Sequence, residues 1–200
     1  MKRYVVAITG ASGAVFALRL IESLVVVAEV HLVISSAAIP IIAYETGLDL
    51  TGDTHGEGSR VERLGRHFNT ERLFYYADDC LHCPLSSGSF ITDGMYVVPC
   101  SMKTLSGIAN GYADNLIIRA ADVVIKQGRP LVLSPREMPF SAIHLENMLR
   151  LARLGVVIAP PVPAFYSHPR DLNGIVDFVT GKLLDSMSIP HNLFKRWDGQ

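Results

Sequence analysis

Short apolar runs alternate with longer amphipathic segments along most of this chain. The runs are rich in Val, Ile and Leu, as buried parallel strands are, and they predict strands at Tyr4–Ile8, Val30–Ile34, Met95–Val98, Leu131–Leu133 and Val156–Ile158. The segments between them carry apolar residues at helical spacing and predict helices at Ala14–Val27, Ala37–Tyr44, Leu105–Lys126, Ser141–Leu154 and Asp171–Met187. Such alternation is typical of an α/β protein with a doubly wound parallel sheet, Rossmann-like or flavodoxin-like, and helices on both faces.

Some stretches depart from this regular pattern. The long helix predicted before Gly128 is expected to break near Gly111. Residues from about 47 to 94 are mixed and polar, with weak helical patterning near Val61–Phe68. No repeat or linker divides the chain, so we expect one domain over residues 1–200. We expect its short tail, Ile189–Gln200, to pack on the functional site or on a neighbouring subunit.

Composition narrows the function classes. The apolar fraction is 49% and the mean hydropathy is +0.28, yet no window approaches the roughly 18 apolar residues of a membrane-spanning helix. A high apolar content without a membrane-spanning segment favours buried subunit interfaces over a merely apolar core. A net charge of −1 provides no basic field for nucleic acid. Three cysteines, and no apolar signal region after Met1, indicate a reducing cytoplasm.

The loop Thr9–Gly13 (TGASG) follows the first predicted strand and opens a helix. Its small residues let the backbone approach a ligand, the free N–H groups at the helix start can bind a phosphate, and Ser12 adds a hydroxyl. A tight turn without ligand is the alternative. The full G-x-G-x-x-G spacing is missing, and the second strand ends in Ile34-Ser35-Ser36 without an acid. A mononucleotide therefore fits better than a dinucleotide, with Ser35 available to a flavin or its ribityl chain.

A second small-residue loop, Pro99–Thr104 (PCSMKT), follows the third predicted strand. Ser101 and Thr104 suit either an ordinary helix cap or contacts to a phosphate shared with the first loop. Cys100 has no visible catalytic partner, so we expect a small buried thiol.

Charged and aromatic residues follow the later strands. The run Leu131–Leu133 ends at Ser134-Pro135, and Arg136 and Glu137 follow at once, where the crevice of an open parallel sheet lies. They place a fixed cation beside a titratable carboxylate. Lys126 ends a helix, where it either complements the helix dipole or shares an anion site with Arg136. Arg119 lies on roughly the same helix face as Lys126. Tyr166 follows the last strand, and Lys182 lies on the final helix.

Two polar stretches of the chain each allow more than one interpretation. Cys80 and Cys83, with His82 between them, form one metal-type pair where structural zinc usually needs two, so a metal site is disfavoured. The run Ser86–Ser89 is either a flexible turn or an anion-contacting loop.

Taken together, these motifs resemble the flavin prenyltransferases of the UbiX type over essentially the whole chain. The resemblance is carried by TGASG at 9–13, SSGS at 86–89, the long blocks at 99–126 and 129–148, and PAFYSHP at 163–169. It implies FMN binding by Gly10, Ala11, Ser12, Ser35, Ser101, Met102, Lys103, Thr104 and Arg136. It places around the phosphate of dimethylallyl phosphate the residues Lys126, Arg136, Glu137, Tyr166 and Lys182.

The resemblance also implies an assembly. Ser87, Gly88 and Arg119 are expected to reach a neighbouring subunit's site in a large homo-oligomer, typically a dodecamer. Glu45, near Ser12, matches a position implicated in late proton transfer, and Trp197 matches a tryptophan that caps the site. The position of Lys182 is Arg in some relatives, so charge rather than geometry matters there. The Cys80–Cys83 pair lies outside the family pattern.

The reaction implied by the resemblance joins a dimethylallyl unit to N5 and C6 of reduced FMN, and the product serves a UbiD-type decarboxylase, for example in ubiquinone biosynthesis. Lys126, Arg136 and Lys182 would stabilise the leaving phosphate in place of a metal. Glu137, kept ionised by Arg136, would relay a proton, and Trp197 would steady the allylic cation. The sequence leaves open whether the donor is the monophosphate or the pyrophosphate.

Two rivals remain at this point. One is an FMN-dependent decarboxylase of the phosphopantothenoylcysteine type, which uses an Asn-bearing P-x-x-x-N loop where this chain reads PCSMKT. The other is a non-catalytic flavin-binding subunit, which would bind flavin and leave dimethylallyl phosphate unchanged.

Overall fold

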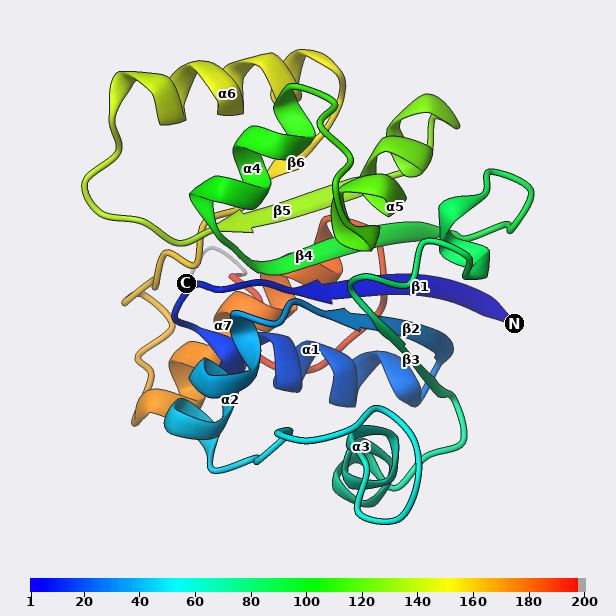
Figure 1. The fold of residues 1–200 in the computed structure, drawn as a ribbon. Coiled ribbons are helices and arrows are strands. Elements are labelled where there is room, and N and C mark those ends of the chain that lie inside the picture. The colour runs from blue at the N-terminus through cyan, green and yellow to red at the C-terminus, as the bar shows by residue number, and fades with distance from the viewer. Residues whose placement is uncertain (198–200) are drawn as a thin grey trace.

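The computed structural model describes residues 1–197, which form a six-stranded parallel sheet between two layers of helices (Figure 1). The strands are β1 Lys2–Ile8, β2 Ala28–Ile34, β3 Leu73–Ala77, β4 Gly94–Cys100, β5 Leu131–Pro135 and β6 Val157–Ile158. All neighbouring strands pair in parallel, in the order β3-β2-β1-β4-β5-β6. This is the strand order of the doubly wound Rossmann fold, so the predicted fold class is confirmed.

The helices divide between the two faces of the sheet. They are α1 Ala14–Val25, α2 Ala38–Thr46, α3 Arg60–Phe68, α4 Met102–Ala109, α5 Leu116–Lys126, α6 Ala142–Arg153 and α7 Leu172–Asp185, with a short 3-10 helix η1 at Pro84–Ser86. On one face α1 packs against α2 and α7, and on the other α4 packs against α5 and α6 (Figure 1). Alternate residues of β1 feed the two cores, because successive side chains of a strand point to opposite faces. No helix within residues 1–197 has both the length and the apolar character needed to cross a membrane.

Each predicted strand is present, but the sequence pattern missed β3. This strand, Leu73–Ala77, has no fully buried residue and pairs with β2 alone, so it lacks the continuous apolar run of a central strand. Its aromatic residues favour a strand and were the available signal. The break expected near Gly111 is confirmed, and it is wide: α4 ends at Ala109 and α5 begins at Leu116.

The order of the strands reverses between β1 and β4. The chain leaves β1 for α1 on one face and leaves β4 for α4 on the other, so the two loops diverge at the carboxyl edge of the sheet (Figure 1). Ligands of open α/β sheets bind in the crevice at such a reversal. The loops Thr9–Gly13 and Pro99–Thr104, both predicted as ligand loops, border this crevice.

Candidate active site

Thr9 fastens the two loops to each other. Its side chain is buried, its Oγ1 donates to the carbonyl of Pro99 at 2.7 Å, and the same oxygen accepts from the N–H of Ser101 at 2.8 Å. The start of α4 therefore has a fixed position relative to the end of β1. Sequence reasoning did not single out Thr9; the signal was a hydroxyl residue directly after a buried strand.

The first loop also lies very close to the start of α2. A Cβ added to Gly10 would come within 2.8 Å of the Cβ of Ala37, so only glycine fits there. Beside this contact, at the end of β2, the hydroxyl of Ser35 is buried and has no hydrogen-bond partner within the described chain. An orphaned buried hydroxyl requires an explanation, and a polar ligand group in the crevice supplies one. These two features fit a flavin at the reversal point.

The N-terminus of α1 is occupied by a side chain of the same protein. The carboxylate of Glu45, from the end of α2, accepts from the N–H of Gly13 at 2.9 Å and from the N–H of Ala14 at 2.9 Å. The prediction that free N–H groups at this helix start bind a phosphate is therefore wrong for these two groups. The physical reason is that α2 delivers an anion to the positive end of the helix dipole. The contact also brings Glu45 beside Ser12, which is exposed and directly precedes Gly13.

The N-terminus of α4 is a second helix start at the crevice and a candidate anion site. The hydroxyl of Ser101 caps it by accepting from the N–H of Thr104 at 3.3 Å. The N–H of Arg136 donates to the carbonyl of Cys100 at 3.2 Å, which places the exposed Arg136 next to this cap. A helix start, two hydroxyls and the backbone of an arginine thus lie on one side of the crevice, and such a combination can form a phosphate site. Met102 and the exposed Lys103 complete the first turn of α4.

Cys100 is an inert thiol. It has no exposed surface, its Sγ donates to the carbonyl of Ser101 at 3.6 Å, and burial raises the pKa of the thiol well above its ordinary value. The prediction of a small buried thiol is confirmed.

Arg136 and Glu137 are both exposed at the end of β5, but no ion pair joins them in the part of the chain described. The Oε1 atom of Glu137 instead accepts from the N–H of Met138 at 3.0 Å. The described residues thus show no direct contact between the side chains of Arg136 and Glu137. The two residues lie in the loop after β5, and adjacency in sequence does not by itself bring two side chains together.

An aromatic pair stands where the described chain ends. The ring centroids of Tyr166 and Trp197 are 6.0 Å apart, with the rings nearly perpendicular, and a hollow of about 450 Å³ opens beside them. Tyr166 also meets Phe178 of α7 edge-on, at 5.8 Å. The tail residues that are described pack on α7 of their own chain, and residues 198–200 of the expected tail lie outside the described residues.

The remaining predicted residues lie elsewhere. Lys126 ends α5, the helix that returns to the amino edge of the sheet before β5, and its Nζ lies 3.6 Å from Asp122. Ser87 and Gly88 are at the same edge, because the Gly88 carbonyl accepts from Arg129 at 2.7 Å. Within one chain, Lys126 therefore does not share an anion site with Arg136 at the carboxyl edge. A site containing both needs a second copy of the chain.

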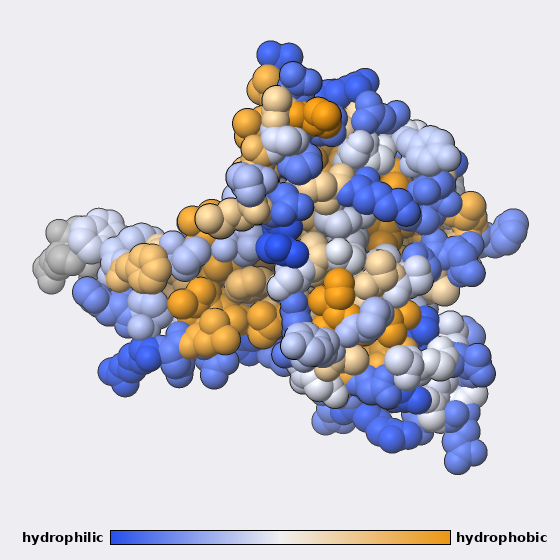
Figure 2. Space-filling model, turned by 60° about the vertical axis from the view of Figure 1, so that its left-hand side comes forward, coloured by the Kyte–Doolittle hydropathy of each residue, from blue (hydrophilic) through white to orange (hydrophobic). Residues whose placement is uncertain are grey.

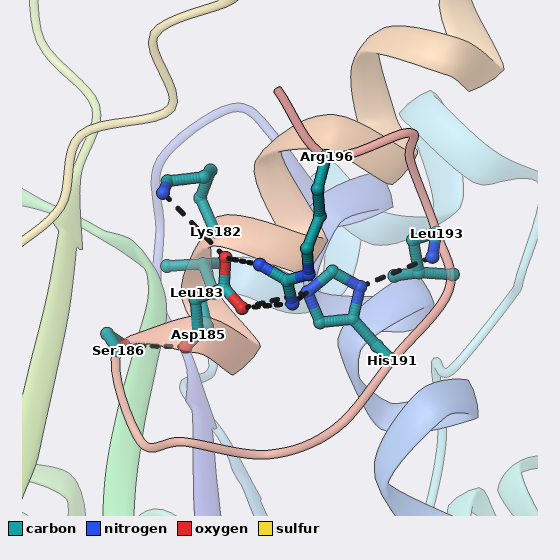
Figure 3. A network of polar contacts seen from close by, with 7 residues as sticks. All are labelled: Lys182, Leu183, Asp185, Ser186, His191, Leu193 and Arg196. Atoms are coloured by element: carbon teal, nitrogen blue, oxygen red, sulfur yellow. Dashed lines mark hydrogen bonds and ion pairs between the residues drawn. The ribbon is translucent and has the colours of Figure 1, made fainter. Parts of the chain in front are cut away.

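Two further cations were predicted as site residues, Arg119 at a neighbouring subunit's site and Lys182 near the phosphate. Arg119 lies on α5 and is partly buried. Lys182 lies on α7, with its Nζ 3.7 Å from Oδ2 of Asp185 (Figure 3). Among residues 1–197, no three His, Cys, Asp or Glu side chains gather as metal ligands, and Cys80 and Cys83 are free thiols.

Known proteins resemble this chain over its whole length. The family described as Flavoprotein matches residues 1–184. The flavin prenyltransferase UbiX of Methanocaldococcus jannaschii is 47% identical over 195 residues, covering 98% of each chain. The flavin prenyltransferase LpdB of Lactiplantibacillus plantarum is 46% identical over 201 residues, covering 100% of each chain.

Solved structures agree with this assignment. A dodecameric FMN-dependent UbiX-like decarboxylase from Escherichia coli O157:H7 has a TM-score of 0.87 at 44% identity, covering 98% of this chain and 100% of that one. AnUbiX in complex with FMN and dimethylallyl pyrophosphate has a TM-score of 0.86 at 40% identity, covering 100% and 98%. The crevice between two ligand loops, the matching family and these full-length relatives lead to one assignment: the chain belongs to the flavoprotein family and, within it, to the flavin prenyltransferases of the UbiX type.

Proposed function

We propose that this protein transfers the dimethylallyl group of an allylic phosphate to N5 and C6 of reduced FMN. The observation that carries the proposal is the meeting of the α4 N-terminus with Arg136 at the β1/β4 reversal, fixed by Thr9. The α4 N-terminus and Arg136 together would form an anion site next to the crevice, where the Ser35 hydroxyl lacks a hydrogen-bond partner within the described chain. AnUbiX, which is 40% identical, was crystallised with FMN and dimethylallyl pyrophosphate.

Residues from two sides of the crevice are candidates for binding FMN. Gly10, Ala11, Ser12 and Ser35 border the crevice from the β1 and β2 sides, where Gly10 allows close approach and the Ser35 hydroxyl lacks a partner. The cofactor phosphate would be held at the start of α4, by a group comprising Ser101, Met102, Lys103, Thr104 and Arg136. When bound, reduced FMN supplies the nucleophilic N5 and C6 atoms that accept the five-carbon unit.

The cations of the chain would make the substrate phosphate a better leaving group. In the proposed site Arg136 would come from one chain and Lys126 from a second, because Lys126 lies at the opposite edge of the sheet. Lys182, in the last turn of α7, would add a third cation. Fixed positive charge stabilises the negative charge that develops as the C–O bond breaks. Tyr166 and Trp197 would shield the allylic cation from water and stabilise it with their ring faces. The family resemblance implies the monophosphate as donor, and the pyrophosphate, which is bound in AnUbiX, is the alternative to be tested.

Two carboxylates would handle protons. Glu137 is exposed at the crevice edge and would exchange a proton with the departing phosphate. Glu45 lies at the start of α1, one residue from Ser12, so a hydroxyl–carboxylate pair is available for the late proton transfer of ring closure.

A homo-oligomer would complete each site. Ser87, Gly88, Arg119 and Lys126 would approach the crevice of a neighbouring subunit. Large apolar side chains are exposed on and before α6 and after β6, among them Met138, Ile143, Leu149, Val162 and Phe165. Figure 2 shows hydrophobic surface of this kind on the side that carries the carboxyl edge. Surface of this character marks interfaces, and the E. coli relative is dodecameric, so we infer a dodecamer here.

The product, a flavin carrying an additional ring, would serve a UbiD-type decarboxylase, for example in ubiquinone biosynthesis. The three cysteines are free thiols, which suits the reducing cytoplasm that we propose as the site of action.

The test is an anaerobic incubation of the full-length protein with reduced FMN and either dimethylallyl phosphate or the pyrophosphate, followed by mass measurement of the flavin. We expect a flavin heavier by one isoprene unit with the monophosphate. Flavin that stays bound and unchanged with both donors would instead identify a flavin-binding subunit. Release of CO₂ from an acid substrate, with ordinary FMN, would identify a decarboxylase.

A further inference from the structure

The C-terminal tail is held on α7 by polar contacts around Asp185 (Figure 3). Arg196 donates to both carboxylate oxygens, at 2.7 Å to Oδ1 and 3.2 Å to Oδ2. Nε2 of His191 lies 3.1 Å from Oδ1, and the N–H of Leu193 donates to Nδ1 of the same ring at 3.2 Å. Because Nδ1 accepts, the ring carries its proton on Nε2, directed at Asp185. One carboxylate thus binds two separate residues of the tail.

The tail lies this close because position 181 of α7 is a glycine. A Cβ at Gly181 would come within 2.4 Å of the ring of Phe194 and 2.6 Å of the ring of His191. Aromatic rings on both sides leave no room for a methyl group, so any larger residue must push the tail away from the helix.

Aromatic contacts connect the docked tail to the hollow beside Tyr166 and Trp197. Phe194 packs on Phe178 of α7 at 5.0 Å, and Phe178 in turn meets Tyr166 at 5.8 Å. Trp197, one residue after Arg196, stands against Tyr166. Docking of the tail on α7 therefore sets the place of Trp197.

Lys182 is the third group at this carboxylate, after Arg196 and His191, and it makes the weakest contact with it. Its Nζ is 3.7 Å from Oδ2 and its side chain is 58% exposed, a geometry of low interaction energy. Arg196, by contrast, is the main cause that lowers the pKa of Asp185 below its ordinary value. Arg196 is thus the main ion-pair partner of Asp185. The ammonium group of Lys182 is paired only weakly and can bind another anion.

We propose that Asp185 is a positioning residue that docks the tail and Trp197 on α7, and that Arg196, by occupying this carboxylate, leaves Lys182 available to the phosphate of the allylic substrate. Naming that substrate rests on the proposed function, whereas the docking of the tail rests on the contacts above. Loss of Arg196 then has two consequences: the tail loosens, and Asp185 turns to Lys182 and neutralises it.

The first readout is fluorescence, because Trp197 is the single tryptophan of the chain. In the FMN-loaded full-length protein, Arg196→Gln and Gly181→Ala should both shift Trp197 emission to the red and increase its quenching by acrylamide. Arg66→Gln, which removes an exposed arginine paired with Glu62 on α3, is the matched control and should change neither. Unchanged emission in both tail variants overturns the docking.

The second readout is substrate affinity, taken as the KM for dimethylallyl phosphate and as the calorimetric Kd of the same compound. Arg196→Gln should raise both by about fivefold, the effect of one exposed ion contact, with a smaller change in kcat. The double variant Asp185→Asn/Arg196→Gln should restore the affinity, because no carboxylate then competes for Lys182, while Trp197 emission stays shifted. A double variant as weak as the single one overturns the competition, as does a wild-type protein that does not bind dimethylallyl phosphate. If the wild type binds it but transfers no prenyl group, the proposed function fails and both readouts still decide this inference.

Discussion

At the scale of single residues, the crevice depends on a few side chains that have defined partners or conspicuously lack one. Thr9 ties two loops, Gly10 permits their close approach to α2, and the Ser35 hydroxyl is left for a ligand. Arg136 stands beside the start of α4 because its own N–H is bound to the carbonyl of Cys100. A backbone hydrogen bond, rather than an ion pair, therefore fixes the main chain of Arg136 at this place.

Arg136→Ala should lose FMN retention and turnover. Removing one charge-assisted contact to a phosphate costs about 1.5–3 kcal/mol, which is about tenfold to a hundredfold in affinity or rate. The measurements are the flavin content of the purified protein and the rate of flavin prenylation. Arg153→Ala, an exposed arginine in the last turn of α6, serves as the control. Full flavin content and turnover in Arg136→Ala would remove this residue from the site.

His31 gives the protein a pH-dependent stability. It is buried among Phe74, Tyr76 and Phe90, and burial lowers its pKa from 6.5 to about 4, while Glu29 partly opposes this shift and Arg3 adds to it. Because the folded-state pKa lies below the unfolded one, the unfolded chain binds the proton more readily. The stabilisation is complete above pH 6.5 and is lost as the pH falls toward 4, at about 1.4 kcal/mol per pH unit.

His31→Gln, which can keep the hydrogen bond to the Tyr76 hydroxyl, should make this acid dependence shallower by about one proton. The free energy of unfolding in urea, measured between pH 6.5 and pH 4, checks the slope. His55→Gln controls for the loss of a histidine as such, since His55 is exposed. Equal slopes for the wild type and His31→Gln would show that this ring does not carry the effect.

At the scale of elements, the helix starts at the carboxyl edge are not equivalent. The dipole of α1 is satisfied by Glu45 of α2, whereas that of α4 faces the crevice with only a serine cap. The same sequence device, a small-residue loop before a helix, thus gives a helix–helix clamp in one case and a candidate phosphate site in the other.

Glu45→Gln should lower the free energy of unfolding by about 1 kcal/mol, because it removes the charge that caps α1. Urea denaturation measures this, and Glu57→Gln in an exposed loop is the control. The variant should also slow the late proton transfer, which would appear as an accumulating flavin species of unfinished ring closure. A stability equal to that of the wild type would mean that the clamp contributes nothing to folding.

At the scale of the whole molecule, the predicted phosphate ligands divide between opposite edges of one subunit. Arg136 and Glu137 are at the carboxyl edge, and Lys126 and Gly88 are at the amino edge. If all of them belong to one site, as we propose, that site needs two chains, and the exposed apolar surface on α6 is a candidate for the contact between them.

Mixed oligomers test this division. Lys126→Ala and Arg136→Ala should each be nearly inactive, and co-expression of the two variant chains should restore part of the prenylation rate, because some sites then combine both intact residues. Co-expression of Arg136→Ala with Glu137→Gln is the matched control, since both residues belong to the same half of the site and no site becomes intact. Absence of recovery in the first pair alone would argue for a site within one subunit.

The sequence by itself determined the layered α/β architecture, the two small-residue loops at the carboxyl edge of the sheet and the family. Apolar runs at Val30–Ile34 and Leu131–Leu133 specify buried strands locally, and the motifs of the loops are contiguous. It missed β3, because an edge strand with partly exposed side chains has no buried run. Only the tertiary structure decided that Glu45 fills the start of α1, that Arg136 and Lys126 lie apart, and that Asp185 seats the tail. These are contacts between segments distant in sequence, and their geometry follows from how the sheet and helices pack, which no local pattern encodes.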